Sequence, residues 1–216
     1  MKIDLCLMVW NEYQGCRQVV PEIPYDLFNE VFALDGGSTD GTVEYLRKIG
    51  VQVVPQRQKG YNIAYIEAFE RTEADFLIFF HPKGSIDPRS LARCVNLARE
   101  GYDLVIASRN IKDAKNEEDD QLFKPRKTFV NVLALLSALL WKRDRPMIWD
   151  VLHGYRGMSK KAFETIDPLR QGLSMDLEMV VRSYKFRLSR IEYPVQEKPR
   201  EHGNTHFNAF PTGWEL

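Results

Sequence analysis

The sequence predicts an α/β fold with a mainly parallel central sheet flanked by helices. Short apolar segments alternate with helical segments through residues 1–110, and this alternation indicates βαβ units. The segment 77–80, Leu-Ile-Phe-Phe, is apolar without alternation, as expected of a strand that is buried on both faces. A chain of 216 residues can bury a core of its own, so we expect a single domain over 1–216.

The first half supplies five expected strands, each a short apolar run bounded by turn residues. They are residues 3–9, 30–34, 51–54, 75–80 and 103–107. The helices expected between them are residues 13–20, 42–49, 61–73 and 88–100. Pro21 ends the first helix. Asp87 and Pro88 begin the last, because Asp caps helices and Pro fits the first helical turn.

The second half has a different pattern. The polar segment 111–120 ends in the acidic run 117–120 and is expected to be a mobile, solvated loop. Helices are expected at residues 127–141, 160–166 and 174–185, and a strand at 188–195. The helix 127–141 is apolar, and two interpretations stay open: it packs on the core, or it lies in a membrane interface.

Composition and charge exclude several classes of protein. Lys plus Arg number 30 and Asp plus Glu number 30, so the net charge is zero, which argues against a nucleic-acid partner. Cys6, Cys16 and Cys94 form no Cys-x-x-Cys pair, which favours reduced thiols in a cytoplasmic protein. The first residues lack the features of a signal peptide, and the longest apolar run is shorter than the roughly 20 residues of a transmembrane helix. We therefore expect neither segment, and peripheral membrane attachment stays open.

The most specific string is Asp35-Gly36-Gly37-Ser38-Thr39-Asp40-Gly41-Thr42. It places a carboxylate at the end of an expected strand, then glycines that let the backbone approach a ligand, then the start of a helix. Such a carboxylate can accept hydrogen bonds from a base or a ribose. The alternative is a structural one, in which Ser38 and Asp40 cap the helix that follows.

Together with its neighbours, this string resembles the family-2 glycosyltransferases, which have the GT-A fold. The family's first strand ends in a pattern like Pro-x-Tyr-Asn-Glu, and its second in Asp-Asp-x-Ser-x-Asp-x-Thr. A Gly-rich helix start, an Asp-x-Asp-Gly motif with a later Asp-Pro, and Gly-Ser-Arg come next. The matching residues, in order, are Met8 to Glu12, Asp35 to Thr42 with Gly36 in place of the second Asp, Gly60 and Ala64, His81 to Gly84 with Asp87-Pro88, and Ala107-Ser108-Arg109.

The later half is similar to the dolichyl-phosphate-mannose-synthase branch of that family. The residues that fit it are Arg126, Asn131, Asp150, Gly154-Tyr155-Arg156 and Arg200-x-x-Gly203-x-Thr205. The resemblance thus covers nearly the whole chain. It implies transfer of a sugar from a nucleotide diphosphate sugar, UDP- or GDP-linked, with inversion. It also implies a nucleotide-binding half, 1–110, and an acceptor-side half with a C-terminal tail, 111–216.

The resemblance also implies roles for individual residues. Asn11, Glu12 and Asp35 would hold the nucleoside. Residues expected to bind the phosphates or the sugar are Ser108, Arg109, Arg126, Arg156 and Arg200, since Arg grips phosphate oxygens bidentately. The alternative for the arginines is a surface ion pair.

Two carboxylates are candidates for the catalytic base that a hydroxyl acceptor would need. Asp176 occupies the position of a Glu-Asp pair found in many relatives, and Asp150 is the second candidate. Alternatively, Asp176 only favours the helix N-terminus. An anionic lipid phosphate would need no base, so the acceptor stays open.

One departure from the family pattern bears on the metal. The Asp-x-Asp pair normally holds a divalent cation against the diphosphate, but here its positions are His81 and Lys83. We therefore expect no metal site, no required Mn²⁺ or Mg²⁺, and direct contact between Lys83 and the diphosphate. Two alternatives stay open. His81 and Asp87 could bind a metal, or the chain could be a degenerate relative that acts as a nucleotide-binding, sugar-binding or interaction module.

Overall fold

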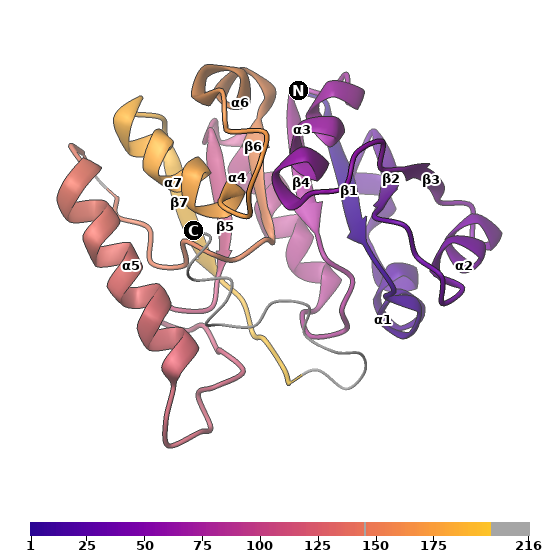
Figure 1. Ribbon diagram of the computed structural model, residues 1–216, viewed down its shortest axis with the longest axis horizontal. Helices are drawn as coiled ribbons and strands as arrows, with labels where there is room; N and C mark the ends of the chain where they lie inside the picture. Colours follow the sequence, from indigo (N-terminus) through magenta and orange to yellow (C-terminus); the bar gives the residue numbers. More distant parts are fainter. Residues whose placement is uncertain (145, 200–216) are drawn as a thin grey trace.

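The computed structural model describes residues 1–144 and 146–199 of the chain. In that part, one sheet of seven strands has the order β3-β2-β1-β4-β6-β5-β7 (Figure 1). The strands are β1 (Ile3–Val9), β2 (Glu30–Asp35), β3 (Gln52–Pro55), β4 (Phe76–Phe80), β5 (Leu104–Ser108), β6 (Arg156–Ser159) and β7 (Arg190–Pro194). β6 runs antiparallel to β4 and β5, and the other pairings are parallel. The predicted α/β class with a mainly parallel sheet is confirmed.

Helices cover both faces of the sheet. They are α1 (Tyr13–Val19), α2 (Thr42–Lys48), α3 (Tyr61–Arg71), α4 (Leu91–Arg99), α5 (Pro125–Trp141), α6 (Lys160–Ile166) and α7 (Met175–Lys185). Alternate residues of β1 point to opposite sides. Cys6 and Met8 pack in a core cluster with α3, α5, α6 and α7, whereas Leu5 and Leu7 pack in a second cluster with α1, α2 and α4.

Most expected elements of the first half are present within one or two residues of their predicted bounds. The last helix of that half begins as a 3-10 turn, Pro88–Ser90, and Asp87 caps it by accepting a hydrogen bond from the Arg89 amide at 2.9 Å. The structural alternative for Ser38 and Asp40 holds in part, because Asp40 Oδ1 accepts a hydrogen bond at 3.0 Å from the amide of Thr42, the first residue of α2. The residue before α2 is Gly41, with a positive φ of 94°, while Ser38 accepts a hydrogen bond from the Asn11 amide instead.

Strand β6 was not predicted from the sequence. It is only four residues long, and it contains Gly157, so it shows no apolar run. A side chain at Gly157 would overlap the ring of Phe76 on β4, which explains why a glycine is needed there. Through β6 and β7, the second half of the chain completes the sheet begun by the first half.

The acidic run was wrongly expected to be solvated throughout. Glu118 is buried, with 6% exposure, and its carboxylate accepts hydrogen bonds from the amides of Arg126 and Lys127 at 3.4 and 3.0 Å. Those amides belong to the first turn of α5, where no helical carbonyl is available to them. Glu118 therefore anchors the loop 111–120 to the start of α5.

Candidate functional site

The candidate site lies where the carboxyl ends of the parallel strands meet, at the lower edge of the sheet in Figure 1. In the sheet, β2 and β3 lie on one side of β1, and β4 lies on the other, so the order of strands along the chain reverses at β1. Ligands of open α/β sheets bind outside such a switch point, since the loops on either side diverge there. The segments that follow β1, β2 and β4 begin at Trp10, Gly36 and His81, so all three border this point.

The loops after β1 and β2 are bonded to each other. Asn11, with a positive φ of 53°, accepts a hydrogen bond from the Thr39 amide at 2.7 Å, and the Glu12 amide donates to Thr42 Oγ1 at 3.0 Å. Asp35 is 7% exposed and accepts hydrogen bonds from the amides of Gly37 and Ser38. The three predicted nucleoside-binding residues, Asn11, Glu12 and Asp35, are thereby brought together at one place.

The loop after β4 approaches helix α1 closely. A Cβ at Gly15 of α1 would overlap the carbonyl oxygen of Pro82 and lie 3.0 Å from the Lys83 Cα. Gly84, with a positive φ of 81°, completes the turn beside Gln18. The backbone that carries Lys83 is therefore seated against α1, next to the switch point.

The same region does not fit a divalent cation. In the part of the chain that the structure describes, no group of three or more His, Cys, Asp or Glu side chains is arranged to hold a metal ion. Asp87 is occupied by Arg89, whose Nη2 lies 2.6 Å from Asp87 Oδ2. His81 Nε2 lies 2.5 Å from the position that a Cβ on Gly154 would take. The described residues of this region therefore do not reproduce the oxygen-rich ligand set that Mg²⁺ or Mn²⁺ requires.

Asp176 lies in a buried polar cluster. It is 6% exposed, its Oδ2 accepts a hydrogen bond from Tyr61 at 2.6 Å, and its Oδ1 lies 3.0 Å from Arg156 Nε and 3.3 Å from the Tyr65 hydroxyl. Burial raises the pKa of Asp176, and the charge of Arg156 and the tyrosine hydrogen bonds oppose that rise without cancelling it. A carboxylate with a raised pKa is a stronger base, which suits proton abstraction from an acceptor hydroxyl.

Arg109 and Asp150 form a bidentate ion pair. Nε and Nη2 of Arg109 lie 2.8 and 2.9 Å from the two oxygens of Asp150, whose side chain is fully buried. Burial works to raise the pKa of Asp150, but the charge and hydrogen bonds of Arg109 outweigh it and lower this pKa to about 2. Glu197 lies 3.4 Å from Arg109 Nη1. Asp150 is thus a weak base whose carboxylate positions Arg109.

The remaining predicted residues lie in different surroundings. Arg156 is fully buried and donates to the carbonyl oxygens of Val151, His153 and Asp176. Arg126 lies on the surface, 3.0 Å from Glu117, which is the alternative predicted for it. Ser108 is buried at the end of β5, where its Oγ accepts a hydrogen bond from the Asn110 amide. Arg200 lies outside the described residues.

Several residues of the site were missed by the sequence reasoning. Tyr61 and Tyr65 face Asp176 from α3, and Gly15 and Gly154 allow close approaches of the backbone. The spacing of Tyr61 and Tyr65 by four residues puts both on one face of a helix, which was the available signal. The glycines carried no signal, because their function depends on segments distant in sequence.

Comparisons with known proteins identify what this arrangement is similar to. The family model described as Glycosyl transferase family 2 matches residues 14–167. The low-salt glycan biosynthesis hexosyltransferase Agl6 of Haloferax volcanii is 30% identical over 98% of this chain and 51% of the relative. A dolichyl-phosphate hexose transferase of the same organism is 24% identical over 97% of this chain and 89% of the relative.

Comparison with solved structures shows that the fold is similar to that of a known glycosyltransferase structure. Glucosyl-3-phosphoglycerate synthase of Mycobacterium tuberculosis, in complex with Mn²⁺, UDP and phosphoglyceric acid, superposes with a TM-score of 0.73. The match covers 94% of this chain and 72% of that chain, at 18% identity. Among the curated relatives, the chain spans 51% of the length of Agl6 and 65% of the length of the glycosyltransferase AglJ.

Proposed function

The chain belongs to glycosyl transferase family 2, and from that premise we propose that it transfers a sugar from a UDP- or GDP-linked donor to a lipid phosphate. The observation that carries the proposal is the set of three loops at the switch point between β1 and β4. It brings Asn11, Glu12 and Asp35 together and seats the backbone of Lys83 beside them. The names of two relatives, a hexosyltransferase and a dolichyl-phosphate hexose transferase, support a hexose and a polyprenyl phosphate acceptor.

In this proposal, the reaction is a single displacement. An oxygen of the acceptor phosphate forms a bond to the anomeric carbon, while the bond from that carbon to the β-phosphate oxygen breaks. The nucleoside diphosphate leaves with the electron pair, and the configuration inverts. An ionised phosphate has no proton to lose, so the step needs no base. With a hydroxyl acceptor, the proton would go to Asp176, which is the stronger base of the two predicted carboxylates.

Lys83 takes over part of the charge stabilisation that the family's cation normally supplies. Charged groups that are already positioned next to a departing phosphate stabilise the charge that develops on it. The close seating of the Pro82–Lys83 backbone on Gly15 supports such fixed positioning. We propose that Lys83 contacts the diphosphate directly and that the donor binds without a metal.

One set of contacts favours a second candidate, a relative that binds a nucleotide or sugar without transferring it. Arg109 is held by Asp150 and Glu197, Arg126 is paired with Glu117, and Arg156 is buried. Three of the arginines expected to grip phosphate are therefore already engaged with carboxylates or carbonyls.

A transfer assay separates the two candidates. The protein is incubated in EDTA with UDP- and GDP-hexoses and a short polyprenyl phosphate, and the products are identified by mass spectrometry. The proposed function predicts a glycosylated polyprenyl phosphate and free nucleoside diphosphate in equal amounts. Donor binding with no product, with or without Mn²⁺, would support the non-catalytic candidate.

A further inference from the structure

Helix α5 exposes an apolar face that the rest of the described chain does not cover. Its outward residues are Phe129, Val132, Leu135, Leu136, Leu139 and Leu140, which are 44–78% exposed. The opposite side packs on the core through Val130, Ala134 and Ala138. A helix that is apolar all round is normally covered on every side, by protein or by lipid. Here only one side is covered.

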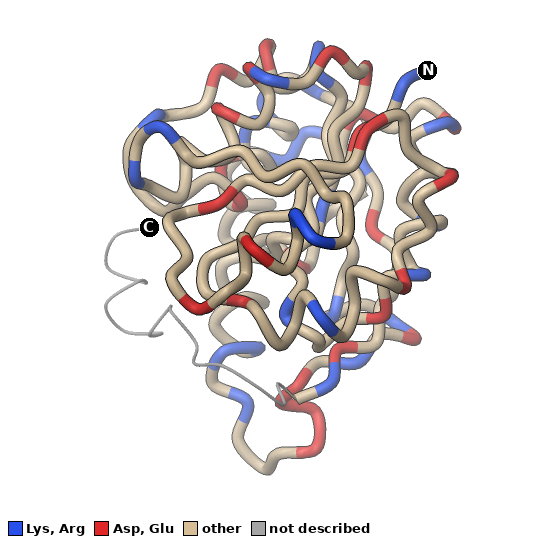
Figure 2. The backbone as a smooth tube through the Cα atoms, turned by 90° about the vertical axis from the view of Figure 1, so that its right-hand side faces the viewer, with Lys and Arg blue, Asp and Glu red and all other residues tan. Residues whose placement is uncertain are grey.

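The face continues into the loop before the helix. Leu122 and Phe123 are 92% and 79% exposed, the highest values among the large hydrophobic residues of this region. The loop projects beyond the body of the molecule at the end where the strands' carboxyl ends lie (Figure 1). Figure 2 shows acidic and basic residues on the arms of this loop and none at its tip. A projecting apolar tip next to an apolar helix face is suited to insertion into a deformable surface, such as that of a lipid bilayer.

The charged residues next to the apolar face of α5 bear on which partner covers that face. Lys124, Arg126, Lys127, Lys142 and Arg143 are the charged residues of the segment 124–143, and all are basic, although the chain as a whole has no net charge. They flank the apolar face at its two ends. At the N-terminal end, Lys124 and Lys127 pair with Asp119, and Arg126 pairs with Glu117. Arg143, past the other end, donates to the carbonyl oxygens of Leu140 and Lys142.

A second copy of the chain would meet this charge pattern differently in its two orientations. If two α5 helices paired in parallel, Lys142 and Arg143 of both copies would meet, whereas an antiparallel pair would bring them to the end that also carries Glu117 and Asp119. Anionic headgroups at a bilayer surface would complement Lys142 and Arg143, while the apolar face enters the boundary of the acyl chains. No helix in the described residues is long and apolar enough to cross a membrane, so α5 would lie along the surface.

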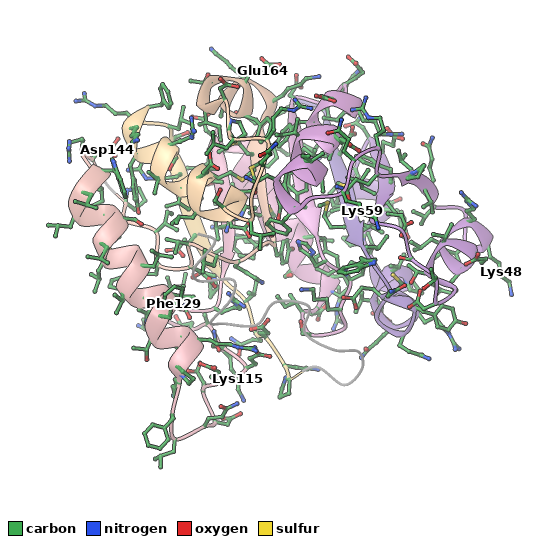
Figure 3. The ribbon with its side chains drawn as sticks, in the orientation of Figure 1. Lys48, Lys59, Lys115, Phe129, Asp144 and Glu164 are labelled. Atoms are coloured by element: carbon green, nitrogen blue, oxygen red, sulfur yellow. The ribbon has the colours of Figure 1, made fainter. Side chains whose placement is uncertain are left out.

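We propose that α5 and the tip Leu122–Phe123 dock the protein on the surface of an anionic bilayer. Figure 3 shows α5 along one side of the molecule, with Phe129 near its start and Asp144 beyond its end. Docking through both the helix face and the tip brings the end of the molecule that carries the candidate site toward the membrane. This surface uses no residue of the donor site, so the proposal can fail or hold independently of the proposed function.

The test is sedimentation with lipid vesicles in the absence of nucleotide. One set of vesicles is pure phosphatidylcholine, and the other also contains phosphatidylglycerol. The wild-type chain is expected to sediment with the anionic vesicles, and less so at high salt. Replacing both Leu135 and Leu139 by Gln, or both Leu122 and Phe123 by Ser, should weaken binding by roughly tenfold or more, since each exposed side chain contributes about that factor.

A matched control replaces two exposed apolar residues elsewhere, Ile49→Gln with Leu169→Gln, and should bind vesicles like the wild type. Circular dichroism and melting temperature establish that every variant is folded. No sedimentation of the folded wild-type chain with either vesicle would overturn the proposal, as would equal loss in the control. A dimer that light scattering detects and the α5 variant abolishes, without vesicle binding, would assign the face to a second copy.

Discussion

The Tyr61 hydroxyl donates a 2.6 Å hydrogen bond to Oδ2 of Asp176, which joins the start of α3 to the first turn of α7 across 115 positions of sequence. Arg156 holds the other oxygen of the same carboxylate at 3.0 Å. The carboxylate of Asp176 is therefore held from both sides within a buried polar cluster. Its orientation depends on residues from two other segments, α3 and β6.

Replacing Asp176 with Asn tests which acceptor is used. With a polyprenyl phosphate, we expect kcat to fall by less than about tenfold, because an ionised phosphate needs no general base. The measurement is kcat at saturating donor, taken well below the melting temperature of the variant. Since general-base catalysis contributes about 10²–10⁴-fold, a loss of that size would contradict the phosphate acceptor and favour a hydroxyl.

Arg109→Ala should destabilise the fold strongly. It would leave Asp150 buried without its counter-charge, which typically costs about 3–5 kcal/mol. Urea denaturation at neutral pH measures the change in the free energy of unfolding. Arg93→Ala, which removes an exposed pair with Glu100, is the control and should change little. Equal effects of the two substitutions would show that the buried pair does not stabilise the fold.

The ion pair between Arg109 and Asp150 should make the stability of the fold depend on pH. The pKa of Asp150 is about 2 in the folded chain, against about 3.9 for an unfolded Asp. A lowered folded pKa contributes stability above the unfolded value, and this contribution is lost as the pH falls from about 4 to about 2. The stability difference between wild type and Asp150→Asn should therefore shrink over that window. A difference that stays constant would contradict the role assigned to Arg109.

Gly15→Ala should weaken donor binding while leaving α1 helical. The new Cβ would overlap the carbonyl oxygen of Pro82, so the loop that carries Lys83 must move. Because alanine favours a helix more than glycine does, the helix itself should not suffer. Calorimetric titration with UDP and GDP measures the effect. Gln14→Ala, at the neighbouring exposed position, is the control and should bind as the wild type does.

Lys83→Ala should raise the dissociation constant of the nucleotide diphosphate by about 10–100-fold, since a charge-assisted contact contributes about 1.5–3 kcal/mol. Lys48→Ala, at the end of α2, removes the same charge elsewhere and should have little effect. Restoring the family's pair with His81→Asp and Lys83→Asp together should make binding depend on Mn²⁺. Unchanged affinity in Lys83→Ala would contradict the contact with the diphosphate.

The sequence predicted elements that depend on local signals. The strand 3–9 and the helix 160–166 have the predicted bounds, because apolar patterning defined the first and Ser159, whose Oγ accepts a hydrogen bond from the Ala162 amide, caps the second. Local patterning could not reveal β6, whose formation depends on Gly157 packing against Phe76.

Long-range pairing limited the prediction of the site in the same way. Arg109 and Asp150 were each singled out, but their ion pair joins positions 41 apart and could not be read from either motif. Arg156 matched a family position, yet the structure buries it among backbone carbonyls. Residue identity therefore indicated which side chains matter, and the tertiary contacts determined which groups they meet.

The most direct test of the central claim, a donor site that works without a metal, is a thermal-shift panel of UDP, GDP and their sugars, each with Mn²⁺ and with EDTA. A ligand at about 100 times its dissociation constant adds about 2.7 kcal/mol to the free energy of unfolding, which such an assay detects. A metal-free donor site predicts that one nucleotide series raises the melting temperature equally in EDTA and in Mn²⁺. A shift that appears only with Mn²⁺, or no shift with any donor, would contradict it.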